Sequence, residues 1–161
     1  MKLRVLDERI AARCGSTQAE HPWWPCASGC ATCCQSLPHL PTITRPEWER
    51  LDAAIAALPD RDAVEAAILG EHTAPVTCPL LSEAGTCRVY EARPIACRTY
   101  GFYTERDASL HCAQVGAAIE QHEALVTWGN GEAINDDLRT LGETRDLRGW
   151  LSERRGVASG P

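Results

Sequence analysis

Four cysteines fall within the nine residues of the stretch CASGCATCC, at positions 26 to 34, and this density constrains the fold more than any other feature. Two of them, Cys33 and Cys34, are adjacent. Adjacent cysteines can form a disulfide with each other only with strain, so this pair does not suit a fold held together by disulfides. The stretch instead raises the question of a structural metal, an iron–sulfur cluster or a catalytic thiol.

Chain length and net charge limit the possible folds and partners. A length of 161 residues predicts a single domain over residues 1–161 that is large enough to bury a core. The 22 acidic residues against 16 basic ones give a net charge of −6, which repels phosphate backbones and argues against a nucleic-acid partner.

The N-terminal sequence MKLRVLDERIAARCG is interrupted by charges, and no segment has the roughly 20 apolar residues of a membrane span. We therefore expect a cytoplasmic protein with no membrane partner. In a reducing compartment, nine cysteines favour metal or redox chemistry over disulfides.

Periodicity and capping signals predict a mainly α protein, a small helical domain with irregular cysteine-rich metal-binding segments. Thr44-Arg45-Pro46-Glu47 has the form of a capping box, and Asp60 is a candidate cap for the following helix. The expected helices cover residues 2–14, 44–58, 60–69, 90–98, 107–126 and 135–151. Residues 71–105 are otherwise irregular.

Glycines set the expected helix ends and turns. Gly15 closes the first helix, and Gly70 closes the helix that begins after Asp60, whose inner face is expected to carry Val64, Ala67 and Ile68. Gly85 predicts a tight turn, and residues 128–131 predict another.

The first cysteine set, Cys26, Cys30, Cys33 and Cys34, sits at i, i+4, i+7 and i+8. On a short helix all four would project from roughly one quarter of the surface. Gly29 lowers helix propensity, so a loop wrapped around a metal is the alternative. Because neighbouring cysteines rarely serve one ion, Cys33 and Cys34 indicate two adjacent sites, or one ligand beside a second thiol that supports it.

The second set, Cys78, Cys87, Cys97 and Cys112, is spaced too widely for a local zinc finger. Eight cysteines suit two sites of four thiolates each, or one site and a few structural thiols. Zinc and iron, including a 4Fe–4S cluster, both remain open, whereas calcium and magnesium prefer oxygen ligands. The ninth cysteine, Cys14, lies on the apolar stripe of the first helix and is interpreted as a small buried hydrophobic residue.

Signals for catalysis are weak. The Cys26-x3-Cys30-x2-Cys33 spacing is that of radical S-adenosylmethionine enzymes, but the chain is too short for their barrel and shows no run of βα units. No Ser-His-Asp order, phosphate loop or HExxH motif is present. The sequence leaves enzymatic activity open and favours a protein that is not an enzyme.

Two arginines flank Cys97. Arg93 and Arg98 are candidates for hydrogen bonds to thiolate or cluster sulfur, which would stabilise the negative charge. The competing interpretation for Arg93 is an ion pair with Glu91 or another acid of the fold.

These residues, taken in order, resemble a known family. The pattern runs Cys-x3-Cys-x2-Cys-Cys, Cys-Pro-Leu-Leu, Gly-x-Cys, Tyr-Glu-x-Arg-Pro-x-x-Cys-Arg and a later Cys. It is similar to the YkgJ-like bacterial cysteine-cluster family, the CxxCxxCC group, described as a zinc- or iron-chelating domain. The matching residues are Cys26, Cys30, Cys33, Cys34, Cys78, Pro79, Leu80, Gly85, Cys87, Tyr90, Glu91, Arg93, Pro94, Cys97, Arg98 and Cys112.

The resemblance covers residues 26–112 and implies metal chelation through the eight cysteines. It makes residues 26–112 the metal-binding core and leaves the helix at 135–151 outside it. Flagellin lysine N-methylases carry a similar cluster, which implies an enzymatic alternative. The expected roles are therefore a structural or storage metal domain, an iron–sulfur redox protein, or an enzyme or maturation factor. The metal ion or cluster is the one partner that the sequence indicates.

Overall fold

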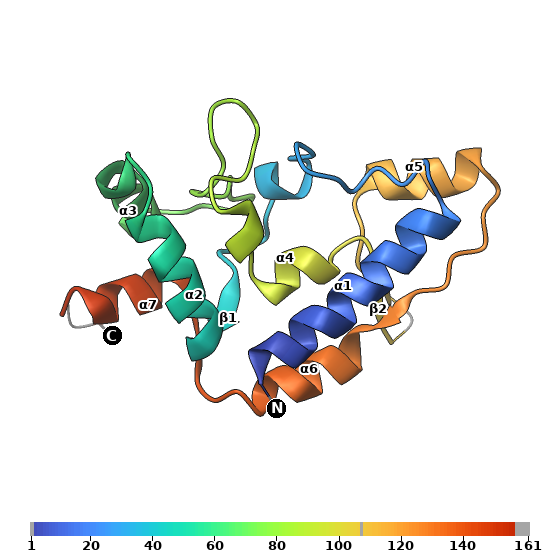
Figure 1. Cartoon of the computed structure of the whole chain (residues 1–161). Helices are drawn as coiled ribbons and strands as arrows, with labels where there is room; N and C mark the ends of the chain where they lie inside the picture. The colour runs from blue at the N-terminus through green and yellow to red at the C-terminus, as the bar shows by residue number, and fades with distance from the viewer. Residues whose placement is uncertain (1, 107, 157–161) are drawn as a thin grey trace. The chain divides into compact units, whose positions relative to one another are not determined.

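The computed structural model describes residues 2–106 and 108–156 (Figure 1). Its elements are α1 (Leu3–Glu20), η1 (Cys33–Gln35), β1 (Thr42–Thr44), α2 (Arg45–Ala56), α3 (Arg61–Leu69), η2 (Tyr90–Ala92), α4 (Ile95–Thr99), β2 (Tyr103–Glu105), β3 (Ala108–Ser109), α5 (Ala113–Gln121), β4 (Gly129–Asn130), α6 (Gly131–Arg139), β5 (Thr144–Asp146) and α7 (Leu147–Arg154). Helices dominate, and the strands form one two-stranded and one three-stranded sheet in the described residues. The prediction of a mainly α protein is confirmed.

The chain divides into two compact units, each with its own core. Unit 1 comprises Met1–Cys30 and Ile95–Gly142, and unit 2 comprises Ala31–Pro94 and Glu143–Pro161. The prediction of a single folding domain over residues 1–161 stays a prediction. In the described residues, no helix is both long enough and apolar enough to span a bilayer.

Unit 1 is built from α1, α4, α5, α6 and the sheet β3-β2-β4, in which β2 pairs antiparallel with β3 and parallel with β4. Its core residues are Leu6, Ile10, Trp24, Ile95, Phe102, Tyr103, Val115 and Ile134. Arg9 of α1 forms an ion pair with Asp137 of α6 on the surface of this unit.

Unit 2 packs α2, α3 and α7 with the antiparallel pair β1–β5. Its core residues are Ile43, Trp48, Leu51, Ile55, Val64, Ile68, Cys78, Leu80, Val89, Ala92, Leu147, Trp150 and Leu151. The Trp150 indole donates to the carbonyl of Ile43 at 2.9 Å, which satisfies its one polar atom inside the core. The predicted capping box at Thr44 and Glu47 is confirmed.

Two predicted helices have wrong bounds near glycine or proline. α1 passes through Gly15, because one glycine in a helix costs only about 1 kcal/mol, and it ends at Glu20, where Pro22 restricts the backbone of His21. Pro94 likewise forces Arg93 into extended backbone and splits the expected helix at 90–98 into η2 and α4.

The expected inner face of α3 is partly wrong. Val64 and Ile68 are buried as predicted, but Ala67 is exposed and Glu65 is buried in its place. Glu65 forms ion pairs of 2.5 Å with both Arg154 and Arg155 in unit 2, and this pairing offsets the cost of burying its carboxylate.

The predicted helix at 107–126 is too long. Asp107 lies outside the described residues, residues 108–109 form β3, and the helix spans only Ala113–Gln121, with Cys112 as its N-cap. It ends at His122, and Glu123 follows with a left-handed backbone (φ +46°).

The predicted turn at residues 128–131 is wrong. Its glycines lie in a strand and at the start of a helix, where the missing side chain lets other parts of unit 1 pack against the backbone. Gly129 lies in β4, and a Cβ there would meet the ring of Tyr103 at 2.4 Å. Gly131 begins α6, and a Cβ there would meet the carbonyl oxygen of Thr104 at 2.7 Å.

The predicted C-terminal helix at 135–151 is two helices. α6 ends at Arg139, Gly142 adopts a left-handed backbone (φ +104°), and β5 intervenes before α7. Asp146 caps α7 by accepting a hydrogen bond from the amide of Gly149 at 2.7 Å.

Candidate metal centre

The eight cysteines of the sequence motif divide four and four between the units. Unit 1 holds Cys26, Cys30, Cys97 and Cys112, and unit 2 holds Cys33, Cys34, Cys78 and Cys87. The boundary falls between Cys30 and Ala31, inside the CASGCATCC stretch. The nine cysteines all lie in described residues, and the structure joins none of them by a disulfide.

The short helix expected at 26–34 is wrong, and the loop alternative is what the structure contains. Gly29 has a left-handed backbone (φ +92°), which interrupts any helix, and the only ordered turn of helix is the 3-10 segment η1 at its end. The thiols therefore do not form one ridge, and the loop passes from unit 1 to unit 2.

In unit 2, backbone contacts bring the two cysteine segments together. The amide of Cys78 donates to the carbonyl of Cys34 at 2.7 Å. Just beyond, Leu37 and Val76 form an isolated antiparallel bridge with hydrogen bonds of 2.9 and 2.7 Å. Cys34 and Cys78 are thus neighbours although 44 positions separate them in the sequence.

A tight hairpin places Cys87 beside the same pair. Leu81 and Cys87 form an antiparallel bridge, and the amide of Arg88 donates to the carbonyl of Leu80 at 2.9 Å. The predicted turn at Gly85 is confirmed, since Gly85 has φ +75° and its amide donates to the Ser82 carbonyl at 3.0 Å.

Backbone amides of this hairpin point at its sulfurs. The amides of Leu80 and Leu81 donate to the Cys78 sulfur, and the amide of Val89 donates to the Cys87 sulfur. Each cysteine therefore receives a hydrogen bond from the amide two residues later. Donors of this kind stabilise a thiolate and hold it in place for a metal.

The adjacent cysteines share a hydrogen bond. The Cys34 thiol donates to the Cys33 sulfur, and this bond is the main cause that lowers the pKa of Cys33 from 9.0 to about 6, against the opposing effect of burial. The hydrogen bond from Cys34 thus favours the thiolate form of Cys33.

The pKa values of the other two thiols of unit 2, those of Cys78 and Cys87, are raised. Burial raises the pKa of Cys78 to about 11 and also raises the pKa of Cys87. The charges of Cys33 and Cys87 act on Cys78, and the charge of Cys33 acts on Cys87. The three sulfurs are therefore close enough to repel one another as thiolates, which a bound cation would reverse.

Arg93 lies near the unit 2 thiols. Its guanidinium carbon lies 3.6 Å from the centre of the Tyr90 ring, and its Nε donates to the Tyr90 carbonyl at 3.0 Å. Its positive charge lowers the pKa of both Cys33 and Cys87. The structure thus places Arg93 near the thiols, held by Tyr90.

In unit 1, contacts with two residues locate the thiols of the CASGCATCC stretch. A Cβ at Gly101 would meet the Cys26 sulfur at 2.6 Å, and Gly101 has φ +86°. The Cys30 thiol is 3.6 Å from the side-chain oxygen of Gln114 on α5. Cys112 caps that helix, and Cys97 lies on α4, four positions before Gly101. The four thiols thus belong to the α4–α5 region.

Arg98 and Cys14 are also in unit 1. Arg98 forms an ion pair with Asp7 and donates to the Asp7 carbonyl at 3.3 Å. The half-buried Cys14 packs against the core of unit 1, and its thiol lies 3.5 Å from the carbonyl of Arg98.

The donor set fits a soft metal in its chemistry, because thiolates prefer zinc, iron and iron–sulfur clusters. The geometry is not closed: in residues 2–106 and 108–156, no group of three His, Cys, Asp or Glu side chains is positioned to hold an ion as it stands. To hold an ion, the thiols of each unit would have to turn toward one another.

Some parts of this site were not predicted from the sequence. The amide donors Leu80, Leu81 and Val89 are backbone groups, and their only signal is their position two or three residues after a cysteine. Gly101 was not identified, although a glycine between two motif cysteines, Cys97 and Cys112, was a visible hint of close approach.

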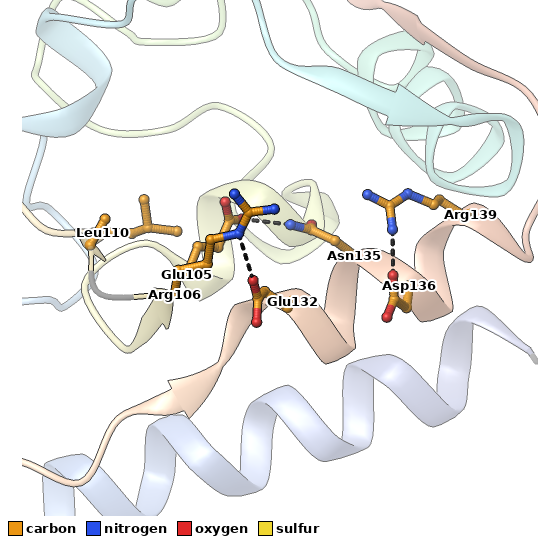
Figure 2. A pocket seen from close by; sticks show the side chains of 8 residues that line it. Glu105, Arg106, Leu110, Glu132, Asn135, Asp136 and Arg139 are labelled. Atoms are coloured by element: carbon orange, nitrogen blue, oxygen red, sulfur yellow. Dashed lines mark hydrogen bonds and ion pairs between the residues drawn. The ribbon is translucent and has the colours of Figure 1, made fainter.

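A cavity of about 800 Å³ lies in unit 1 between α6 and the β2–β3 hairpin (Figure 2). Its lining residues are Glu105, Arg106, Ala108, Leu110, Glu132, Asn135, Asp136 and Arg139. Figure 2 shows three polar pairs in its wall: Arg106 with Glu132, Asn135 with Glu105, and Arg139 with Asp136. The lining includes no cysteine, so this cavity is separate from the thiols.

Comparison with known proteins gives one match. A family model described as "CxxCxxCC: Putative zinc- or iron-chelating domain" matches residues 25–122. No curated protein and no solved structure matches the chain.

Proposed function

Because the chain belongs to the CxxCxxCC family of zinc- or iron-chelating domains, we propose that it binds a soft metal at two thiolate centres, one in each compact unit. The ligands of the unit 1 centre are Cys26, Cys30, Cys97 and Cys112. The ligands of the unit 2 centre are Cys33, Cys34, Cys78 and Cys87. This assignment departs from the expectation that two adjacent cysteines do not serve one ion, because both Cys33 and Cys34 lie in unit 2 with only two other cysteines. The observation that carries the proposal is the division of the eight motif cysteines, four to each unit.

Tetrathiolate coordination accounts for the shared features of the unit 2 cysteines. The sulfurs of Cys33, Cys78 and Cys87 would repel one another as thiolates. Two nearby groups stabilise negative charge on them, the backbone amides and the Arg93 guanidinium. These thiolates would hold a divalent ion, whose charge would offset their repulsion. Its binding free energy is also folding free energy for the irregular segment between Leu69 and Tyr90.

Zinc and iron share this chemistry, and they differ in what the bound protein does. A zinc ion held by four thiolates has no redox chemistry and serves structure or storage. An iron–sulfur cluster on the same thiolates transfers electrons, and amide hydrogen bonds to its sulfurs tune its potential.

The test is elemental analysis with a visible spectrum on the full-length protein purified without air or chelator. We expect either two zinc ions in a colourless protein, or iron with matching acid-labile sulfide in a brown one. A folded protein that holds neither metal would contradict the proposal.

The division into two centres has its own test. Variants C26S/C112S and C78S/C87S should each lose half of the metal, and combining them should remove all of it. If either double variant alone lost all of the metal while keeping its far-UV circular dichroism spectrum, the cysteines would form a single centre and the division would be wrong.

A further inference from the structure

A second cavity, of about 310 Å³, opens in unit 2 on the side of Cys78 that faces α3. Its wall combines the α3 residues Ala63, Val64 and Ala67 with Asp60, His72, Thr77, Cys78, Pro79, Leu81 and Arg88. Cys78 is the buried cysteine of this unit, with 9% of its surface exposed, whereas Cys33, Cys34 and Cys87 are half-buried. The cavity thus gives solvent a path to the proposed ligand that is otherwise most enclosed.

The wall carries an oxygen, a nitrogen and a sulfur donor. The Asp60 carboxylate is a hard donor, the His72 imidazole is intermediate, and the Cys78 thiol is soft. His72 Nε2 lies 3.1 Å from the Ile68 carbonyl, which only accepts, so in the neutral ring Nε2 bears the proton and Nδ1 keeps its lone pair. In the described residues these donors do not form a ligand cluster as they stand, although all three line the same cavity.

An ion pair stands in this cavity. Arg88 pairs with Asp60, and the two side chains are 26% and 38% exposed. The Nε of Arg88 is buried and has no hydrogen-bond partner. The guanidinium therefore neutralises Asp60, and a cation that binds this carboxylate must displace the guanidinium.

We propose that this cavity is the route by which the metal ion reaches Cys78, with Asp60 as the entry ligand and Arg88 as the counterion that the metal displaces. The inference rests on the proposed metal-binding function. Asp60 would hold the incoming cation in place of the Arg88 guanidinium. Cys78 would then accept it, and the thiol proton of Cys78 would leave to solvent as the metal–sulfur bond forms.

The experiment measures the rate at which the full-length, chelator-treated protein takes up Cd²⁺, followed by stopped-flow absorbance of the metal–thiolate bond. Asp60 stands at the N-cap of α3, but its side chain makes no capping hydrogen bond, so the predicted cap is not formed. Asp60→Asn keeps the size of the side chain but removes the charge, and we expect uptake to slow by about threefold or more. Arg88→Gln leaves Asp60 unpaired, and we expect uptake to become faster. The final metal content of both variants should equal that of the wild type.

Asp62→Asn is the matched control. Asp62 lies in the first turn of α3, two residues from Asp60, and is 90% exposed, but it does not line this cavity. Its variant should load at the wild-type rate. If D60N and D62N slowed uptake equally, the cause would be overall charge and the route would be overturned; unchanged uptake in D60N would overturn it as well.

Failure of the inference and failure of the function give different results. A wild-type protein that takes up no Cd²⁺, zinc or iron contradicts the metal-binding function itself. Normal metal content with equal rates in the wild type, D60N and R88Q contradicts only the route through the cavity.

Discussion

The two units hold the same number of motif cysteines but prepare them differently. In unit 2 the thiols influence one another electrostatically, and a hairpin aims backbone amides at two of the sulfurs. In unit 1 the thiols are positioned by separate supports, Gly101 beside Cys26 and Gln114 beside Cys30. The spacing of motif cysteines in a sequence therefore says little about which of them the fold already organises before a metal binds.

The largest effect should come from removing a ligand of the better organised unit. Cys78→Ser should abolish metal binding in unit 2 and lower Tm by at least about 10 °C, because structural zinc contributes about 10 kcal/mol of binding free energy in small domains. Elemental analysis with thermal unfolding checks this. Cys14→Ser is the control and should keep both metals; retention of all metal in C78S would remove Cys78 from the ligand set.

A glycine pair compares the units directly. Gly101→Ala and Gly85→Ala both place a side chain on left-handed backbone, which costs about 1–2 kcal/mol. Only at Gly101 does the new Cβ also meet a sulfur, that of Cys26 at 2.6 Å, whereas at Gly85 nothing lies within 4 Å. G101A should therefore lose metal from unit 1 and more stability than G85A, as measured by urea unfolding and metal content. Equal losses in the two variants would mean that Cys26 has room to move.

The acidic shift of Cys33 predicts a pH dependence for the metal-free protein. Its folded pKa of about 6 lies below the ordinary 9.0, so the stability that its thiolate contributes is complete above pH 9 and declines as pH falls toward 6. Alkylation of Cys33 by iodoacetamide, followed by mass spectrometry, should have a midpoint near pH 6. Cys34→Ala should move this midpoint upward, and Cys14→Ala should not; a midpoint near 9 in the wild type would contradict the shared hydrogen bond.

The smallest effect is expected from Arg93, which acts on the thiols only through its charge. Arg93→Gln should weaken metal binding in unit 2 by about tenfold, in line with other groups that surround metal ligands. Competition with a chromophoric chelator measures the affinity. Arg148→Gln removes an exposed arginine of α7 and is the matched control; an equal loss in both variants would reduce the role of Arg93 to net charge.

Local signals were the parts of the fold that the sequence predicted well. The capping box at Thr44 and Glu47 and the turn at Gly85 are confirmed because a few adjacent residues determine each. Gly129 and Gly131 were misinterpreted as a turn, since their role is to admit Tyr103 and the Thr104 carbonyl from a distant part of the chain. Contacts of that kind leave no local pattern.

The candidate site follows the same rule. The eight cysteines and their family could be identified from residue types and order, and the family is confirmed. Their division between two units was not predictable, because the boundary after Cys30 depends on which core each segment joins. The metal, the absence of a nucleic-acid partner and a cytoplasmic location stay predictions.

The hairpin that carries Cys78 and Cys87 has a consequence for how this segment tolerates mutation. Its donors to sulfur are the amides of Leu80, Leu81 and Val89, which every residue except proline supplies. The exposed side chains of Glu83 and Ala84 at the tip can therefore vary without loss of a donor, whereas Gly85 is constrained by its left-handed backbone. A single proline at position 80, 81 or 89 would remove one while leaving every cysteine in place, so a search for damaging variants should look beyond the cysteines themselves.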